Sequence, residues 1–187
     1  MKNYSGIILV SGLAGSGKDT FADMLAEELR GRGLRVVRDM FAKYIKQYMK
    51  DYYGWDGITK DDKIRTKLQV LGTDIIKEKL NYTAFHARRL AEDFKIFEDD
   101  FDYFIVSDTR FRDEIYTMMA SFPGKVLTVR IVRPELESKL TGEQKNHKSE
   151  NDLKRVKHDC TIINSAGLDE LMEDVKAFVD NYTERNF

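Results

Sequence analysis

Short apolar segments alternate along the chain with longer segments whose apolar residues recur at helical spacing. The apolar segments predict strands at residues 5–11, 34–37, 101–107, 125–132 and 159–163. The periodic segments predict helices at residues 18–32, 43–52, 61–80, 83–97 and 168–182, with a further helix ending near residue 121. Because strands and helices alternate, we expect an α/β fold in which helices cover both faces of a parallel sheet.

Two segments interrupt this alternation without dividing the chain. Residues 38–100 form a helical insertion between the second and third strands, and polar residues 133–157 begin where Arg133-Pro134 ends the fourth strand. No stretch rich in Pro, Gly or Ser separates two halves. We therefore expect residues 1–187 to form a single domain, and a chain of this length buries roughly 70% of its unfolded surface.

Composition narrows the class of protein. A hydrophobic content of 42% argues against disorder, and the single cysteine, Cys160, cannot form an intrachain disulfide. The apolar run near the N-terminus is too short for a secretory signal or a membrane span. We expect a cytoplasmic protein with no membrane partner.

The net charge of −1 hides an uneven distribution. Residues 1–90 hold 17 basic and 11 acidic side chains, and residues 125–157 hold 9 and 5. Residues 91–124 hold 3 basic and 9 acidic side chains, and residues 158–187 hold 2 and 7. If the two positive segments face one cleft, that cleft would favour binding of a small polyanion. The alternative is that the charges lie on solvated faces and have no ligand. The sequence contains no long tract rich in Lys and Arg, so we do not expect it to bind polymeric nucleic acid.

The residues that follow the first strand form a phosphate-binding loop. The loop matches Gly-x4-Gly-Lys through Gly12, Gly15, Ser16, Gly17 and Lys18, and it lies between an apolar strand and a helix. Glycines let backbone N–H groups surround phosphate oxygens, and the lysine reaches the β- and γ-phosphates. This pattern predicts a nucleoside triphosphate site.

The next two residues are the candidate metal ligands. Asp19 stands where a Ser or Thr hydroxyl normally meets Mg²⁺ in such loops, and Thr20 follows it. Either oxygen could hold the ion, directly or through water.

Phosphate loops serve both hydrolytic switches and phosphoryl transferases. The run Thr59-Lys60-Asp61-Asp62 matches a guanine-reading motif in letters, but it lies in a polar loop before a helix, so we interpret it as accidental. A transferase needs a second phosphate site and a cover that excludes water. The basic insertion 38–100 supplies a candidate acceptor site, and residues 133–157 supply a candidate lid.

Several motifs resemble those of the phage deoxynucleoside monophosphate kinases. They are Ser16-Gly17-Lys18-Asp19-Thr20, Leu68-Gln69-x-Leu71-Gly72-Thr73-Asp74, Ile105-Val106-Ser107-Asp108-Thr109-Arg110 with Glu114, Val132-Arg133-Pro134, His147-x-Ser149-Glu150 and Ile162-Ile163-Asn164, in the family's order. Animal-type phosphomevalonate kinases are similar in the phosphate loop and the Ser-Asp-Thr-Arg strand end but lack the Leu-Gly-Thr-Asp run. That run favours a nucleotide acceptor.

The resemblance implies transfer of a phosphoryl group from ATP to a deoxynucleoside monophosphate (dNMP) with Mg²⁺. It also implies a three-layer P-loop kinase fold with a five-stranded parallel sheet, an acceptor-binding insertion and a lid. The location would be the host cytoplasm if a phage encodes the chain, and a homodimer is compatible with the sequence. A phosphomevalonate-type kinase and an ATP-binding regulatory module without transfer activity remain as alternatives.

Four residues are the expected catalytic residues: Lys18, Asp108, Arg110 and Arg133. Asp108 ends a buried strand, where it would orient Mg²⁺ through water or contact the acceptor; capping the helix after that strand is the alternative. Arg110 would bind the acceptor phosphate with its planar fork, or else pair with Asp113 or Glu114. Arg133 would touch the transferring phosphate when the lid closes.

The expected acceptor residues are Phe41, Lys43, Arg65, Gln69, Asp74, Asp108, Arg110, Glu114 and Lys148. Arg65 and Gln69 lie four residues apart on one helical face, which suits phosphate and base recognition, or else they form an ordinary exposed polar face. Phe41 would stack on the acceptor base or belong to the core. Asn164 would contact adenine in the donor site, or form a turn with Gly167.

Overall fold

A five-stranded parallel sheet organises the molecule, and the computed structural model describes residues 6–59, 61–139, 152–153 and 156–183. The strands lie in the order β2-β3-β1-β4-β5, and every neighbouring pair is parallel. Their bounds are Gly6–Gly12 (β1), Val36–Asp39 (β2), Tyr103–Thr109 (β3), Val126–Val132 (β4) and Cys160–Ile163 (β5). The predicted α/β fold is therefore confirmed.

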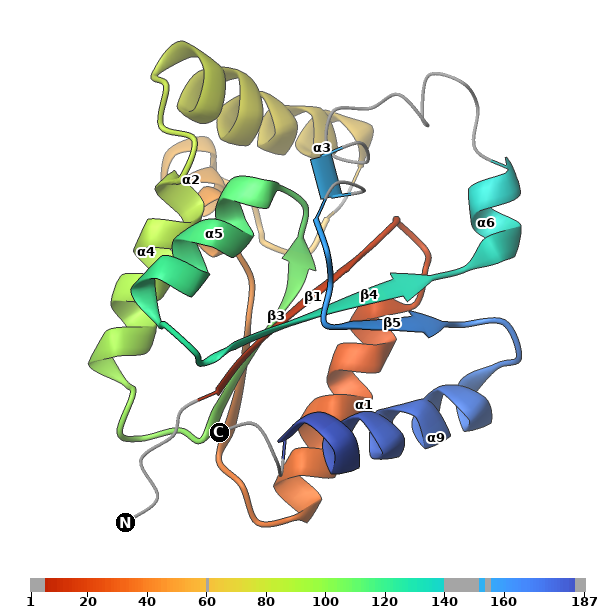
Figure 1. Cartoon of the computed structure of the whole chain (residues 1–187). Helices are drawn as coiled ribbons and strands as arrows, with labels where there is room; N and C mark the ends of the chain where they lie inside the picture. The colour runs from red at the N-terminus through yellow and green to blue at the C-terminus, as the bar shows by residue number, and fades with distance from the viewer. Residues whose placement is uncertain (1–5, 60, 140–151, 154–155, 184–187) are drawn as a thin grey trace.

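Helices cover both faces of this sheet (Figure 1). Helices α1 (Lys18–Gly31) and α9 (Leu168–Phe178) lie on one face, and α4 (Phe85–Ile96) and α5 (Arg112–Ser121) lie on the other. The π-helix η2 (Val179–Thr183) continues α9. Within the described part of the chain, no helix has the length and apolar character needed to cross a membrane.

Most of the insertion between β2 and β3 stands beyond the carboxyl ends of the strands, and its last helix, α4, returns along one face of the sheet (Figure 1). It contains α2 (Lys43–Tyr53), α3 (Asp62–Gln69), the π-helix η1 (Val70–Lys79) and α4. The sequence predicted one helix over residues 61–80, whereas the structure changes from α-helix to π-helix at Val70. π-Helical segments are rare and occur frequently at functional sites.

Glycine at position 72 lets η1 approach α2 closely. A Cβ atom there would lie 2.6 Å from Cδ1 of Ile45 and 3.8 Å from Nε2 of His86. Both neighbours are buried, Ile45 on α2 and His86 on α4. Gly72 therefore marks the point where three helices of the insertion meet.

Alternation along β1 builds two cores. Ile7 and Leu9 pack in the cluster beneath α4 and α5, while Ile8 and Val10 pack in the cluster beneath α1 and α9. A parallel strand covered on both faces is apolar at successive positions, which explains the uninterrupted apolar run that predicted it. The same alternation continues along β3.

A bulge breaks the register of β3 at its carboxyl end. Leu9 of β1 pairs with Val106, but Ser11 pairs with Thr109, so β3 carries one extra residue over this step. Such bulges redirect side chains and are common beside active sites. The residues in this step are Ser107 and Asp108.

Several boundaries differ from the sequence prediction. Strand β3, expected at residues 101–107, begins and ends two residues later, because its pairing with β1 starts at Tyr103. Strand β2 begins and ends two residues later than expected, because Arg38 and Asp39 pair with Ile105 and Val106 despite their polar side chains. Helix α6 (Pro134–Lys139) follows β4 where a polar segment was expected. Proline ends a strand but suits the first position of a helix, where its missing N–H is not needed.

Candidate active site at the carboxyl edge of the sheet

The loop between β1 and α1 has the backbone geometry of a phosphate cradle. Gly12, Gly15 and Gly17 have φ angles of 155°, 81° and 92°, which L side chains rarely adopt. A Cβ atom on Gly12 would lie 2.6 Å from the carbonyl oxygen of Ile131. The hydroxyl of Ser16 is buried and has no hydrogen-bond partner among the described residues. The loop therefore encloses the Ser16 hydroxyl within a turn whose backbone angles favour glycine.

Asn164 supports this loop from the end of β5. Its Nδ2 donates to the carbonyl oxygen of Ser16 over 2.9 Å, and its backbone N–H donates to Val132 over 2.8 Å. A Cβ atom on Gly17 would lie 2.3 Å from that Nδ2. A turn with Gly167 alone does not account for Asn164, because its side chain also binds the phosphate loop. The contact with adenine stays a prediction.

Lys18 and Asp19 form an ion pair at the start of α1. Lys18 is 8% exposed, and its Nζ donates to Oδ2 of Asp19 over 3.1 Å. The hydroxyl of Ser107 donates to Oδ1 of the same carboxylate over 2.8 Å. Burial acts to raise the pKa of Asp19, but the hydrogen bonds from Ser107 and Lys18 outweigh it and lower that pKa. The carboxylate is therefore ionised at neutral pH, and the neighbouring Thr20 is exposed beside it.

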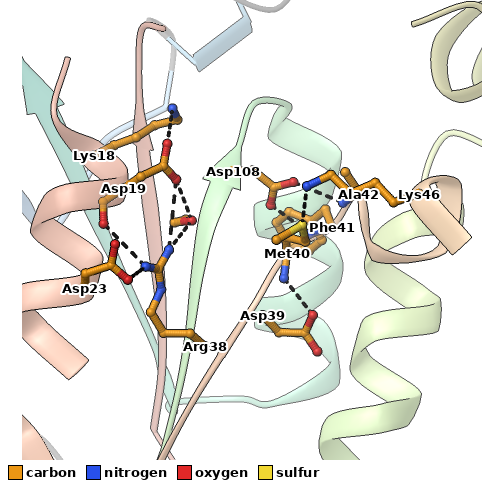
Figure 2. Close-up of polar contacts among 11 residues, drawn as sticks. Lys18, Asp19, Asp23, Arg38, Asp39, Met40, Phe41, Ala42, Lys46 and Asp108 are labelled. Carbon is orange, nitrogen blue, oxygen red and sulfur yellow. Dashed lines mark hydrogen bonds and ion pairs between the residues drawn. The ribbon is translucent and has the colours of Figure 1, made fainter. Parts of the chain in front are cut away.

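Arg38 at the end of β2 completes the network (Figure 2). Its Nη2 donates to the hydroxyl of Ser107 over 2.7 Å, and its Nη1 donates to the carboxylate of Asp23. Neither Arg38 nor Ser107 was a predicted site residue. A signal for Ser107 existed in the Ser-Asp-Thr-Arg strand end, whereas Arg38 carried no signal beyond its place after a strand.

Asp108 points to the opposite side of β3, toward the insertion (Figure 2). Its Oδ1 accepts the N–H of Phe41 over 2.7 Å, and its Oδ2 accepts the N–H of Ala42 over 3.0 Å. Burial raises the pKa of Asp108, although these two N–H donors act against the shift. The alternative that Asp108 caps the helix after its own strand is wrong, because it binds the backbone that precedes α2.

Phe41 is 2% exposed and packs in the core beneath α4 and α5. This placement agrees with the core alternative for the ring, and stacking on the acceptor base stays a prediction. The backbone of Phe41 nevertheless belongs to the site, because its N–H is one of the two groups that Asp108 holds.

Glu114 holds the turn that carries Arg110. Its Oε2 accepts the N–H groups of Arg110 and Phe111 over 2.8 and 3.0 Å, and its Oε1 accepts from Nζ of Lys77 over 3.2 Å. Glu114 is buried, while Arg110 is exposed at the surface of the site. The carboxylate thus contacts the backbone of Arg110. Lys77 was missed by the sequence analysis, since a lysine in an amphipathic helix reads as solvated.

The predicted acceptor residues of the insertion divide into two groups. Lys43 donates to Asp39 over 2.9 Å and to Asp93 over 2.7 Å. Burial acts to lower the pKa of Lys43, but its hydrogen bonds to Asp93 and Asp39 outweigh this effect and raise that pKa. The second group is exposed on α3 and η1: Arg65, Gln69 and Asp74.

The predicted lid is described only in part. Arg133 is exposed immediately after β4, and α6 follows it. Lys148 and His147 lie outside the described residues. Leu153 and Val156 are partly buried against the core beneath α4 and α5, so the end of residues 133–157 returns to the sheet beside α5.

Comparison with known protein families identifies the family of this chain. Residues 55–175, more than half of the 187 residues, match the sequence model of the deoxynucleotide monophosphate kinases. The chain belongs to the deoxynucleotide monophosphate kinase family. It is therefore a phosphotransferase that phosphorylates deoxynucleoside monophosphates. The matched segment contains Asp108, Arg110 and Arg133 but begins after the phosphate loop, so the loop is an independent indication of nucleotide binding.

Solved structures share the fold of this kinase. Two structures of the APS kinase of Mycobacterium tuberculosis, one in complex with AMPPNP and APS, are 12% identical with TM-scores of 0.54 and 0.53. Each alignment covers 96% of this chain and 100% of the other. A sugar kinase from Janibacter sp. is 19% identical with a TM-score of 0.52, over 95% of this chain and 96% of that one. No protein with a curated description matches the chain.

Proposed function

We propose that this kinase binds ATP on the loop of residues 12–20 and a dNMP beneath the insertion, and transfers the γ-phosphoryl group between them at the end of β3. One observation carries the proposal. Ser107 and Asp108 are adjacent, yet Ser107 binds Asp19 of the donor loop and Asp108 binds the backbone that precedes α2. The end of β3 thus joins both sides of one reaction site.

The donor side supplies positive charge where phosphates require it. The positive-φ glycines allow backbone N–H groups to turn toward a bound phosphate, and Lys18 opens α1, whose N-terminus favours anions. Little covalent chemistry falls to the protein in phosphoryl transfer, so catalysis rests on alignment and charge neutralisation. We assign this role to Lys18, and to Arg110 and Arg133 on the side of the transferred group.

Mg²⁺ fits the donor side through Asp19, with Thr20 as a second oxygen donor. The Asp19 carboxylate is ionised, exposed and fixed at the first turn of α1. Mg²⁺ in such enzymes takes one or two protein oxygens together with phosphates and water. Bound there, it would neutralise charge on the β- and γ-phosphates. In the described ranges, no group of three or more His, Cys, Asp or Glu side chains is placed to hold a metal ion.

The acceptor side is assigned to the insertion 38–100. Arg110 is the candidate phosphate ligand, and Asp108 and Glu114 fix the two backbone segments around it. Lys43 would exchange its carboxylate partners for the acceptor phosphate. The exposed residues Arg65, Gln69 and Asp74 would contact the nucleoside, and residues 133–157, with Lys148, would close over both substrates and exclude water.

A coupled assay of ADP release tests the proposal. The purified protein is given ATP with each common dNMP, with phosphomevalonate, and with no acceptor. We expect release with at least one dNMP only, and a loss of about 10²-fold or more in Lys18→Met. Release with phosphomevalonate alone would favour that acceptor, and acceptor-independent hydrolysis would favour a regulatory module. Omission of Mg²⁺ tests the metal, and light scattering tests whether the chain forms a homodimer.

A matched substitution separates charge from site. Lys176 is exposed on α9, and Lys176→Met removes the same charge as Lys18→Met. Activity in Lys176→Met should equal that of the wild type. An equal loss in both variants would show that net charge, rather than the phosphate loop, controls the rate.

A further inference from the structure

A largely buried lysine side chain joins the insertion to the turn after β3. Lys77 lies in the last turn of η1, and Glu114 lies in the first turn of α5. Their side chains are 10% and 5% exposed, and Nζ of Lys77 lies 3.2 Å from Oε1 of Glu114. The two residues are 37 positions apart in the sequence. The pair is therefore a tertiary link between two elements of the active site.

The ammonium group of Lys77 is held from a second direction. It lies 3.3 Å from the centroid of the Phe111 ring, in the range of a cation–π contact. Phe111 is also one of the two residues whose N–H groups Glu114 accepts. Lys77 thus contacts both the carboxylate that fixes the turn and the ring that the turn carries.

Each charge of the pair would be unfavourable in this buried position without the other. Burial lowers the pKa of Lys77 and raises the pKa of Glu114, because each charge has left water. Replacing a buried ion pair by apolar groups is often neutral or stabilising for folding, so such a pair is weak evidence for stability. Beside a functional site, such a pair can instead serve to hold neighbouring residues in position.

The neighbours of this pair are the proposed acceptor ligands. Arg110 precedes Phe111, and its backbone N–H is bound by Glu114. Asp74 is three residues before Lys77, on the same π-helix. Lys77 therefore links the segment that carries Asp74 to the turn that carries Arg110.

We infer that Lys77 is a positioning residue for the acceptor: held between Glu114 and Phe111, it fixes η1 against the turn that carries Arg110. The inference rests on the proposed acceptor site. Misplacement of a reacting group by about 1 Å costs on the order of 100-fold in rate. Loss of the pair should therefore lower kcat/KM for the dNMP while leaving the affinity for ATP unchanged, because the phosphate loop lies on another element.

The test compares Lys77→Met with Lys77→Arg, which keeps the charge, and with Lys77→Met/Glu114→Gln, which removes both charges. We expect kcat/KM for the dNMP to fall about 10-fold to 100-fold in Lys77→Met. The arginine variant should recover part of it. The dissociation constant of a fluorescent ATP analogue should change less than about twofold. If Lys77→Met does not fold, the double variant, which leaves no unpaired buried charge, gives the same comparison.

Lys79→Met is the control, since Lys79 is exposed two residues further along η1. An unchanged kcat/KM for the dNMP in Lys77→Met overturns the inference, and so does an equal loss of ATP affinity, which indicates general damage. Amide hydrogen exchange at Arg110 and Phe111 gives a readout without turnover. Faster exchange in Lys77→Met supports the link even if no dNMP is phosphorylated, whereas unchanged exchange contradicts it.

Discussion

The hydroxyl of Ser107 lies 2.8 Å from Oδ1 of Asp19 and donates a hydrogen bond to it. Arg38 donates to that same hydroxyl from the neighbouring strand. Three elements, β2, β3 and α1, therefore fix one carboxylate in the phosphate loop. The contact explains why a serine occupies a strand position that is 3% exposed.

Removal of this hydroxyl should slow phosphoryl transfer while the protein stays folded. In Ser107→Ala, Asp19 loses one donor and Arg38 loses an acceptor, and a hydrogen bond to a charged group contributes about 1.5–3 kcal/mol. We expect kcat to fall on the order of tenfold, with the melting temperature lowered by a few degrees. Ser121→Ala, at the end of α5, is the control. Equal kcat values in both variants would exclude a role for Ser107.

Substitution of Gly17 should weaken nucleotide binding more than it weakens folding. Gly17→Ala and Gly33→Ala both place a side chain at positive φ, 92° and 82°, with a similar backbone cost of about 1–2 kcal/mol. Only the Cβ of Gly17→Ala collides with Asn164, which would release the loop. Titration with a fluorescent ATP analogue should show at least about tenfold weaker binding in Gly17→Ala and no change in Gly33→Ala.

Close packing at Gly72 predicts a rescue. Gly72→Ala brings a methyl group within 2.6 Å of Cδ1 of Ile45 and should destabilise the protein by about 1–3 kcal/mol. Ile45→Val removes that terminal carbon, so the double variant should be more stable than Gly72→Ala alone. Urea unfolding of the four proteins measures the coupling. Additive effects would show that the two helices do not touch at this point.

Buried His86 should make stability depend on pH. Burial lowers its pKa from 6.5 to about 4, and Lys77 adds to the shift. The unfolded chain therefore binds a proton between pH 6.5 and 4 that the folded protein does not, so stability is lost as the pH falls through this window. The loss between pH 7 and pH 5 should be about 2 kcal/mol.

Urea unfolding at both pH values measures this loss, and His86→Gln should remove about that part of the difference. His158, whose pKa is also lowered by burial, supplies the comparison through His158→Gln. A pH dependence that persists unchanged in His86→Gln would assign it to other groups.

Sequence patterns located the phosphate loop and the strand ends because these depend on short-range order. Gly12 ends β1 and Lys18 begins α1, so one strand and one helix place the loop between them. The carboxyl edge of a parallel sheet also gathers Asp108 and Asn164 without any knowledge of side-chain contacts. The direction in which each side chain points was not predictable in this way.

The missed residues depend on contacts between distant segments. Arg38 and Lys77 are charged residues whose partners lie 69 and 37 positions away, so no local pattern distinguishes them from solvated side chains. The π-helix was missed for a related reason, since apolar spacing predicts a helix but not the close contact at Gly72. The start of α6 was missed because Pro134 both ends a strand and begins a helix.

Asp108 accepts two hydrogen bonds from backbone N–H groups at the start of the insertion, and these bonds restrict how the insertion can move. The chain leaves the sheet at Asp39, is tied to β3 at Phe41 and Ala42, and returns to the sheet at Tyr103 of the same strand. Both ends of the insertion are thus attached to β3. Because α4 is packed against the sheet, a movement of α2, α3 and η1 would have its smallest displacement beside Asp108 and larger ones farther from it, toward α3. Substrate could then be admitted by moving the outer helices while the reacting end stays aligned.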